Sequence, residues 1–394
     1  MKKRPGYLLL VLLAVAVAGK SFAQDSGQTK RFHIALFIPL YLDSVFDENS
    51  SYKQGMNFPK YLNSGLEFYE GTKLAIDSLQ KEGLPLDIQV YDSKSEKMPI
   101  TFVVNSNEFQ HTDLVIGHVT ANESKMLANV VAKKNIPFIN ATYPNDAGVT
   151  NNPDFVILNS TLHTHCAAIY RFIQRNYPLA PVIVFRKKGA QEDKLKSYFE
   201  DLSRTTAAVS LKIKYVTLED NIDSAEVKDA LDDASNTVCI AGSLDVNFGQ
   251  QLTQVLASLY TEHPSVIFAM PTWWDATNFT RPEYKGPEIF YSTPFYLSPS
   301  HKLVMSIQNL FKTKFYSRPT DMVFRGYETM YHFAHLLVLN DKNIGSSLSD
   351  KRFKVFTDFD IQPVLDPKTS TLDYFENKKI YFVKKVDGNV VTVY

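Results

Sequence analysis

Residue types suited to holding a small ligand gather in the turn from Gly117 to Asn122, directly before a predicted helix. Thr120 and Asn122 provide side-chain donors and acceptors, and the first residues of a helix add backbone N–H groups that lack partners within the helix. These groups and the helix dipole favour an anion by about 0.3–1 kcal/mol. Alternatively, Asn122 only caps the helix, in a capping box that Lys125 leaves incomplete. The sequence leaves ligand contact and simple capping open.

Enzymatic chemistry has no comparable support. The GxSxG, HExxH and GxxxxGK[ST] motifs of hydrolases, zinc proteases and P-loop proteins are absent from the sequence. His163 and His165 lie two positions apart in a predicted helix, where their side chains diverge instead of sharing a metal-binding face. We therefore expect no catalytic residues, no metal and no cofactor, and we expect the chain to act by binding.

Residues 1–23 have the pattern of an export signal. Lys2, Lys3 and Arg4 precede an apolar core at Leu8–Ala18, and small residues at the required positions end in Ala23. The core is shorter than the roughly 20 residues that span a bilayer, and no cysteine follows it to carry a lipid anchor. We expect cleavage after Ala23 and a soluble periplasmic product.

Charge excludes nucleic acid as an expected partner. The 394 residues include 42 basic and 42 acidic ones, and four of the basic residues lie in the leader, which leaves 38 basic against 42 acidic. Such a balance provides neither a basic surface for nucleic acid nor a polybasic membrane patch.

The chain has 394 residues, of which 44% are hydrophobic. It is therefore long enough, and apolar enough, for two domains with sizeable cores.

The turn at Gly117 belongs to a predicted β-α-β unit. Asp113–Ile116 and Ile136–Asn140 read as strands buried on both faces, and Glu123–Lys134 reads as an amphipathic helix between them. The helix begins where a parallel sheet presents the carboxyl ends of its strands. In open α/β sheets, ligands bind at that edge.

The same alternation of strands and helices continues along the chain and predicts an α/β protein with two Rossmann-like lobes. Further strands are predicted near Arg31–Asp43 and at Leu86–Tyr91, Phe155–Leu158, Pro181–Phe185, Leu211–Val216, Thr237–Ala241, Val266–Met270 and Ile289–Ser292, followed by a strand-rich tail. Further helices are predicted at Leu66–Lys81, Thr164–Asn176, Glu192–Arg204, Ser224–Ala234, Phe248–Tyr260, Ser300–Phe315 and Tyr327–Leu339.

Each lobe is expected to hold a parallel sheet, with hinge crossovers joining the two. The first lobe would comprise residues 31–143 and about 288–340, and the second lobe residues 144–287 and about 341–394. The segment Tyr143–Asn152 is rich in Pro, Asn, Asp and Gly, a composition typical of a crossover or hinge. The long polar segment Ser44–Ser64 lacks periodicity, and connections of that length tend to be functional or mobile.

Two cysteines allow either a disulfide or free thiols. An exported protein could pair Cys166 with Cys239. Cys166 lies in a helical pattern and Cys239 in a strand-like run, which favours two buried thiols.

Several segments, in consistent order, resemble the type I periplasmic binding proteins. They are GLEFYEGTKLAIDSLQKEGLPLDIQVYDS, DLVIGHVTANES followed by NIPFINAT, NNPDFVILNSTLHTHCAAIYRFI and VFRGYETMYHFAHLL. The resemblance is to the branched-chain amino-acid and receptor ligand-binding type, in particular to bacterial members that carry LysM repeats, which are absent here. It implies capture of a small solute between two lobes that close about hinge strands.

The resemblance also implies ligand contacts in the first lobe. The family binds a carboxylate with a Ser or Thr before the pivotal helix, where this chain has Thr120, Ala121 and Asn122, with Ala121 aligned to the family serine. The next contact falls on Ala141, Thr142 and Tyr143, which alternatively only begin the following connection.

Contacts implied in the second lobe depart from the amino-acid-binding pattern. A basic loop that includes Lys188 replaces the usual aromatic residue, and Gln191 lies near that position. Ser243 stands where a tyrosine is common, and Thr272 where an acid usually pairs with the ligand ammonium, although Asp245 could supply that charge. The groups that bind a zwitterion are therefore incomplete, which argues against an ordinary α-amino acid. The basic loop is either exposed to solvent or binds an acidic or phosphorylated ligand.

Trp273 and Trp274 are the only tryptophans in the chain. Either one of them lines the cleft, which would suit stacking on a sugar or nucleobase, or both pack within the lobe.

Two functions remain: an exported binding protein that delivers a small ligand to an ABC-type transporter or sensor, and a cell-envelope interaction or regulatory protein that has changed or lost its ligand.

Overall fold

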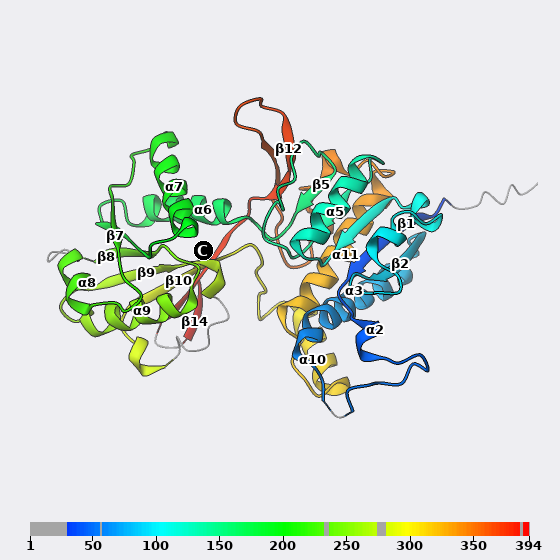
Figure 1. Cartoon of the computed structure of the whole chain (residues 1–394), viewed down its shortest axis with the longest axis horizontal. Coiled ribbons are helices and arrows are strands. Elements are labelled where there is room, and N and C mark those ends of the chain that lie inside the picture. The colour runs from blue at the N-terminus through cyan, green and yellow to red at the C-terminus, as the bar shows by residue number, and fades with distance from the viewer. Residues whose placement is uncertain (1–29, 56, 232–235, 274–280, 387–388, 394) are drawn as a thin grey trace, which may run out of the picture.

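The structure is a computed structural model that describes residues 30–55, 57–231, 236–273, 281–386 and 389–393. Within these ranges the chain forms two α/β lobes that lie side by side, each built on a seven-stranded sheet (Figure 1). The predicted export signal and Trp274 lie outside the described residues. No helix in the described part of the chain is long and apolar enough to span a membrane.

The first sheet has the strand order β11-β12-β5-β4-β3-β1-β2. Its strands are β1 (Phe32–Ile38), β2 (Leu86–Asp92), β3 (Leu114–Gly117), β4 (Phe138–Asn140), β5 (Phe155–Ile157), β11 (Ile361–Leu365) and β12 (Leu372–Asn377). The pairs among β1 to β5 and the pair β5–β12 are parallel, and β11 is antiparallel to β12. β1, β3, β4 and β5 are almost wholly apolar and buried, as strands covered on both faces must be.

The second sheet has the order β14-β13-β10-β9-β8-β6-β7. Its strands are β6 (Val182–Arg186), β7 (Ile213–Thr217), β8 (Thr237–Ala241), β9 (Ser265–Ala269), β10 (Glu288–Thr293), β13 (Tyr381–Val386) and β14 (Asn389–Val393). Here β6 to β10 are parallel, and the two C-terminal strands add an antiparallel edge.

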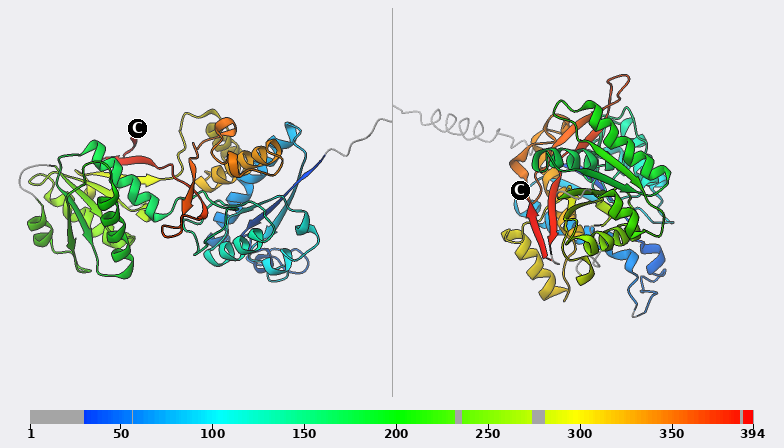
Figure 2. Two further views of the ribbon diagram at one scale, coloured as in Figure 1. Left: turned by 90° about the horizontal axis from the view of Figure 1, so that it is seen from above. Right: turned by 90° about the vertical axis from the view of Figure 1, so that its left-hand side faces the viewer.

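Helices cover both faces of each sheet (Figure 2). The first lobe contains α2 (Leu42–Val45), α3 (Asn63–Lys81), α4 (Ile100–Val103), α5 (Ala121–Ala132), α10 (Lys302–Lys314) and α11 (Asp321–Leu339). The second contains α6 (Leu162–Asn176), α7 (Ala190–Thr205), α8 (Ser224–Ala230) and α9 (Val246–Leu259). In the first lobe, α3, α10 and α11 share one apolar core with the sheet, whereas α5 packs into the core on the opposite face.

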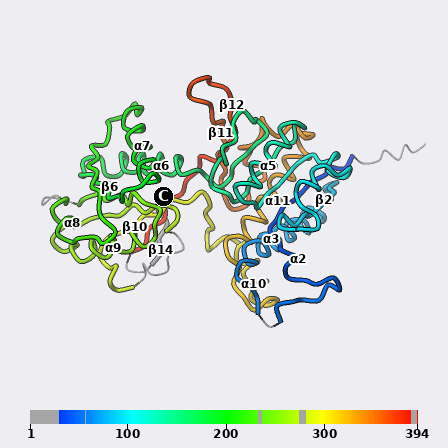
Figure 3. The backbone as a smooth tube through the Cα atoms, viewed as in Figure 1, coloured from blue at the N-terminus to red at the C-terminus, as the bar shows by residue number. Residues whose placement is uncertain are grey.

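Three segments far apart in the sequence cross between the lobes (Figure 3). Residues 158–161 leave the carboxyl end of β5, and residues 294–301 leave the carboxyl end of β10. Residues 378–380 join the end of β12, which is parallel to β5, to Tyr381, which pairs with Thr293 at the end of β10. All three crossovers therefore lie at the carboxyl edges of both parallel sheets, the edges where α/β proteins bind ligands.

The lobe boundaries differ from those expected from the sequence. β5 pairs with β4, so Tyr143–Asn152 connects two strands of the first sheet and the crossover follows β5 instead. β10 belongs to the second sheet, and the β11–β12 hairpin returns to the first. These pairings join residues distant in sequence, and a local apolar pattern does not specify which sheet a strand enters.

Three helices, α5, α6 and α11, begin earlier than expected because the chain caps them with threonine. α5 begins at Ala121 after Thr120, and α11 begins at Asp321 after Thr320, whose hydroxyl accepts a hydrogen bond from the backbone N–H of Met322.

Candidate functional site

His118 joins three segments at the carboxyl edge of the first sheet. It directly follows β3, and its Nδ1 lies 2.6 Å from the hydroxyl of Thr142, which follows β4. Its Nε2 lies 2.9 Å from the hydroxyl of Ser64 in the first turn of α3. Burial, with a smaller contribution from the positive charge of Arg325, lowers the pKa of His118 to about 4. The imidazole is therefore neutral near pH 7, and both of its neighbours can donate or accept a hydrogen bond.

One crossover bonds a member of this cluster, and a second contacts Arg325, whose charge acts on His118. Asn159 in the first crossover donates its side-chain N–H to the backbone carbonyl of Thr142, at 2.6 Å. Phe295 in the second crossover lies under the Arg325 guanidinium, 4.0 Å from it to the ring centroid. The polar groups at the carboxyl edge of the first sheet therefore lie beside the segments that connect the lobes.

The start of α5 is occupied by a carboxylate of the chain itself. Glu123 accepts hydrogen bonds from the backbone N–H of Thr120 at 2.7 Å and from the Thr120 hydroxyl at 2.8 Å. The other carboxylate oxygen of Glu123 accepts from the Lys94 ammonium at 2.7 Å. The alternative in which Asn122 caps this helix is wrong, because Thr120 is the cap and Glu123 its reciprocal partner. The T-x-x-E spacing of these residues is the sequence signal that identifies it.

Tyr41 and Tyr61 form an aromatic pair at the same edge, which the sequence analysis did not assign. Their ring centroids are 4.9 Å apart in an edge-to-face arrangement. Tyr41 has a φ of 56°, which is uncommon for a residue with a side chain. Asp92, at the end of β2, holds this turn by accepting the backbone N–H groups of Leu40, Tyr41 and Leu42 at 2.9, 3.0 and 2.7 Å. Tyr61 is 51% exposed.

Acids pair with the predicted basic loop of the second lobe. Lys187 lies 2.9 Å from both Asp220 and Asp245, and hydrogen bonds to these carboxylates raise the pKa of Lys187. Lys188 pairs with Glu219 at 2.6 Å on an exposed surface. These pairs favour the interpretation of a solvated loop.

The remaining predicted residues of the second lobe lie on the same edge, which follows the carboxyl ends of β6, β8 and β9. Ser243 donates its hydroxyl to Glu192 at 2.8 Å. Thr272 is exposed and donates to the carbonyl of Leu244 at 2.8 Å. Gln191 is exposed in the first turn of α7.

Trp273 is a core residue and does not line a cleft. Its side chain is fully buried in the apolar core of the second lobe, against Gly249 of α9. A Cβ at Gly249 would lie 2.3 Å from the Trp273 ring, so the glycine makes room for the indole. The pairing of this tryptophan with a distant glycine is not visible in the local sequence.

Among the first-lobe candidates, the structure brings Thr142 into direct contact with His118, while Ala141 is completely buried. Tyr143 is half-buried and donates its backbone N–H to Asn140. Ala121 and Asn122 occupy the first turn of α5.

The two cysteines are buried and free, as the sequence favoured, and burial raises the pKa of both thiols. Among the described residues, no group of three or more His, Cys, Asp or Glu side chains could hold a metal ion.

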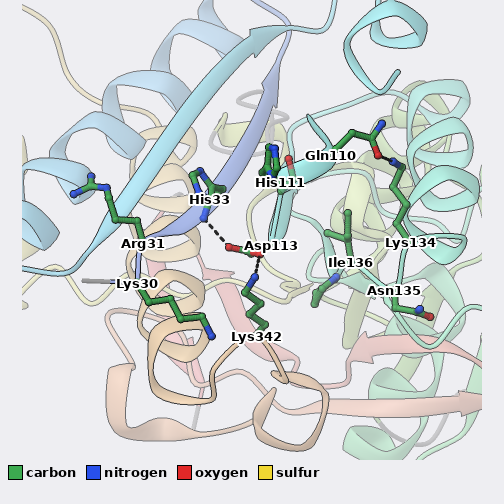
Figure 4. A pocket seen from close by; sticks show the side chains of 12 residues that line it. Lys30, Arg31, His33, Gln110, His111, Asp113, Lys134, Asn135, Ile136 and Lys342 are labelled. Carbon is green, nitrogen blue, oxygen red and sulfur yellow. Dashed lines mark hydrogen bonds and ion pairs between the residues drawn. The ribbon is translucent and has the colours of Figure 1, made fainter. Parts of the chain in front are cut away.

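A cavity of about 600 Å³ lies at the opposite edge of the first sheet, beside the amino-terminal ends of β1, β3 and β4 (Figure 4). Its cations are engaged: Lys342 pairs with the buried Asp113, and Lys134 donates to Gln110. This cavity is remote from the crossovers and from His118.

Solved structures share this architecture across almost the whole chain. A protein of Rhodospirillum rubrum assigned to branched-chain amino-acid ABC transport has a TM-score of 0.67 at 13% identity, covering 92% of this chain and 100% of that one. A substrate-binding protein of Desulfitobacterium hafniense in complex with Leu has a TM-score of 0.54 at 12% identity, with 92% and 100% covered. A solute-binding protein of Rhodopseudomonas palustris in complex with 3,4-dihydroxybenzoic acid has a TM-score of 0.51 at 15% identity, with 92% and 96% covered.

No family model matches the sequence, and no curated protein matches it. The likeness at these low identities concerns the fold, and the two sheets with their three crossovers agree with it. The chain has the fold of the type I periplasmic binding proteins.

Proposed function

We propose that this chain is an exported solute-binding protein that captures a small ligand between its lobes and delivers it to an ABC-type transporter or a sensor. The observation that carries the proposal is the meeting of all three crossovers with the carboxyl edges of both sheets. A ligand held there contacts both lobes, so binding favours their closure.

The proposed site uses residues on both edges. In the first lobe these are Thr120, Ala121, Asn122, Thr142 and Tyr143, together with Ser64 and His118. In the second lobe they are Lys188, Gln191, Ser243, Asp245 and Thr272. Trp273 and Ala141 are left out because both are fully buried.

Two further observations support the proposal. The leader at residues 1–23 suits export to the periplasm. The solved structures with this fold include proteins bound to Leu and to 3,4-dihydroxybenzoic acid, which are small organic solutes of different chemistry. A shared fold does not transfer a ligand, because the site determines the function.

A thermal-shift screen of the mature chain, residues 24–394, tests the proposal. The panel contains amino acids, peptides, sugars and muropeptides. A ligand with a micromolar dissociation constant binds with about −8 kcal/mol, and at a hundredfold excess over that constant it stabilises the chain by about 2.7 kcal/mol. We expect at least one compound to give a saturable rise in melting temperature.

Absence of any saturable shift would contradict ligand capture. In that case, recovery of a defined cell-envelope protein with the mature chain would support the second function, an interaction protein that keeps this fold. The internally paired charges at Glu123 and Lys187 are the observation that favours this second candidate.

A further inference from the structure

The charged groups at the two carboxyl edges are paired within the protein. Glu123 occupies the start of α5, where its side chain is 12% exposed and bonded to both Thr120 and Lys94. An anionic ligand at this helix start would meet a carboxylate that already takes the hydrogen bonds of the Thr120 N–H and hydroxyl. The first lobe therefore offers poor binding to a carboxylate or phosphate at this position.

The second lobe is neutralised in the same way. Lys187 has two carboxylate partners, Lys188 has one, and Arg186 pairs with Asp193. A charged ligand would have to separate these pairs and would leave a cation or a carboxylate without its partner.

Uncharged hydrogen-bonding groups are available instead. The Ser64 hydroxyl, the His118 imidazole and the Thr142 hydroxyl form a continuous row, with separations of 2.9 and 2.6 Å. The two hydroxyls occupy both ring nitrogens of His118, and each hydroxyl keeps further capacity to donate or accept, because a hydroxyl rotates and has one donor and two acceptor sites. Such a row suits the hydroxyl groups of a ligand, which also donate and accept.

An aromatic surface lies near this row. Tyr61 lies two residues before α3 and Ser64 lies in its first turn, so the Tyr61–Tyr41 pair and the hydroxyl–imidazole row share one end of that helix. Tyr41 keeps an unfavourable backbone conformation that three hydrogen bonds to Asp92 maintain. Residues held in such conformations concentrate at ligand-binding sites.

We infer that the cleft binds an uncharged carbohydrate, with one sugar ring stacked on the Tyr41–Tyr61 pair and its hydroxyls bonded to Ser64 and Thr142, which His118 orients. Tyrosine suits this role because its ring offers an apolar face to the C–H groups of a sugar and its hydroxyl remains polar. This inference rests on the proposed function and specifies its ligand class.

Isothermal titration calorimetry of the mature chain tests the inference. The probes are neutral mono- and disaccharides, including N-acetylated ones, with L-leucine and L-glutamate as charged comparisons. We expect saturable binding of at least one saccharide and none of the two amino acids. The dissociation constant should change less than about twofold between 0.05 and 0.5 M salt, because a neutral ligand forms no ion pair that salt can screen.

The variant Tyr61→Ala should weaken saccharide binding at least about tenfold, which corresponds to about 1.4 kcal/mol and lies within the cost of truncating an aromatic anchor in a binding site. Its melting temperature should be retained, since Tyr61 is 51% exposed. The control Leu179→Ala changes a 96% exposed residue ahead of β6, at the far edge of the second sheet, and should leave binding unchanged.

Binding of L-leucine or L-glutamate by the unaltered chain, or saccharide binding that Tyr61→Ala leaves intact, would overturn the inference while the proposed function stands. If no compound binds in this assay or in the broader screen, the proposed function fails and the inference fails with it.

Discussion

His165 is a buried imidazole in the first turns of α6, and its Nδ1 lies 2.8 Å from the hydroxyl of Ser292 near the end of β10. Burial lowers the pKa of His165 to about 4, and burial likewise lowers the pKa of His118 in the first lobe to about 4. Glu328 shows the opposite case of a buried acid: burial raises its pKa to about 7 while Thr357 donates two hydrogen bonds to it. At the residue scale, His118, His165 and Glu328 stay uncharged near pH 6 because they are buried without a charged partner at hydrogen-bond distance among the described residues.

These shifts make stability depend on pH. An unfolded histidine takes up a proton below about pH 6.5, whereas folded His165 does so only near pH 4. The unfolded state therefore binds more protons between these values, so the free energy of unfolding falls as the pH is lowered, by up to ~3 kcal/mol for this residue. The raised pKa of Glu328 acts with opposite sign, as stability is lost when the pH rises from about 4.5 through 7.

The variant His165→Gln isolates the contribution of this histidine to the pH dependence of the free energy of unfolding. Urea unfolding from pH 7 to pH 4 should show a smaller loss of stability in the variant than in the unaltered chain, because glutamine does not titrate. His111→Gln, at an exposed position, should keep the full loss. Identical slopes in all three proteins would contradict the assignment.

Helices α3 and α11 approach so closely that glycine is required at their contact. A Cβ added to Gly71 would lie 1.8 Å from the carbonyl oxygen of Val323, and one added to Gly326 would lie 2.1 Å from the carbonyl oxygen of Phe68. These are backbone atoms of rigid helices, which cannot move aside as a flexible side chain does. At the element scale, this helix pair supports the site, because α3 carries Ser64 and α11 carries Arg325.

Replacing Gly71 by alanine should therefore destabilise the first lobe by about 1–3 kcal/mol through overpacking, despite the higher helix propensity of alanine. Chemical denaturation measures this loss. Gly345→Ala is the matched control, because a Cβ there meets no atom within 4 Å. Equal stability of the two variants would show that the helices can separate without cost.

The elements themselves were largely predictable, and their assembly was not. The helix ending at Lys81 and the strands around Gly117 follow from apolar periodicity, which is a local property. The lobe assignment of β5, the burial of Trp273 and the pairing of Tyr41 with Tyr61 depend on contacts between distant residues. The cap at Thr120 was available from its spacing to Glu123, but the preference of asparagine for caps led to Asn122 instead.

The whole molecule depends on how its crossovers connect the lobes. Glu376, at the end of β12, accepts hydrogen bonds from the Thr161 N–H at 2.8 Å, the Thr161 hydroxyl at 2.9 Å and the Thr164 hydroxyl at 2.7 Å. Burial alone would raise the pKa of Glu376, but the adjacent Lys378 ammonium and these donors hold it below its usual range. One carboxylate thus fixes the start of α6 in the second lobe to a strand of the first.

The variant Glu376→Gln should lower the free energy of unfolding by about 2–3 kcal/mol, because the amide group that replaces the second carboxylate oxygen cannot accept from the Lys378 ammonium and leaves it without its charged partner. Denaturant titration measures this change. Glu219→Gln removes one member of an exposed ion pair and should leave stability unchanged within error. A loss of the same size in both variants would argue against a structural role for Glu376.

The distance between the lobes in the presence and absence of ligand tests capture most directly. Spin labels on Lys125→Cys in α5 and Lys194→Cys in α7 report this distance by pulsed electron paramagnetic resonance, while the native thiols of Cys166 and Cys239 are buried and protected from the reagent. With a saturating amount of the compound that most stabilises the chain, the label separation should shorten as the carboxyl edges close on it. An unchanged distance distribution at saturation would contradict capture between the lobes.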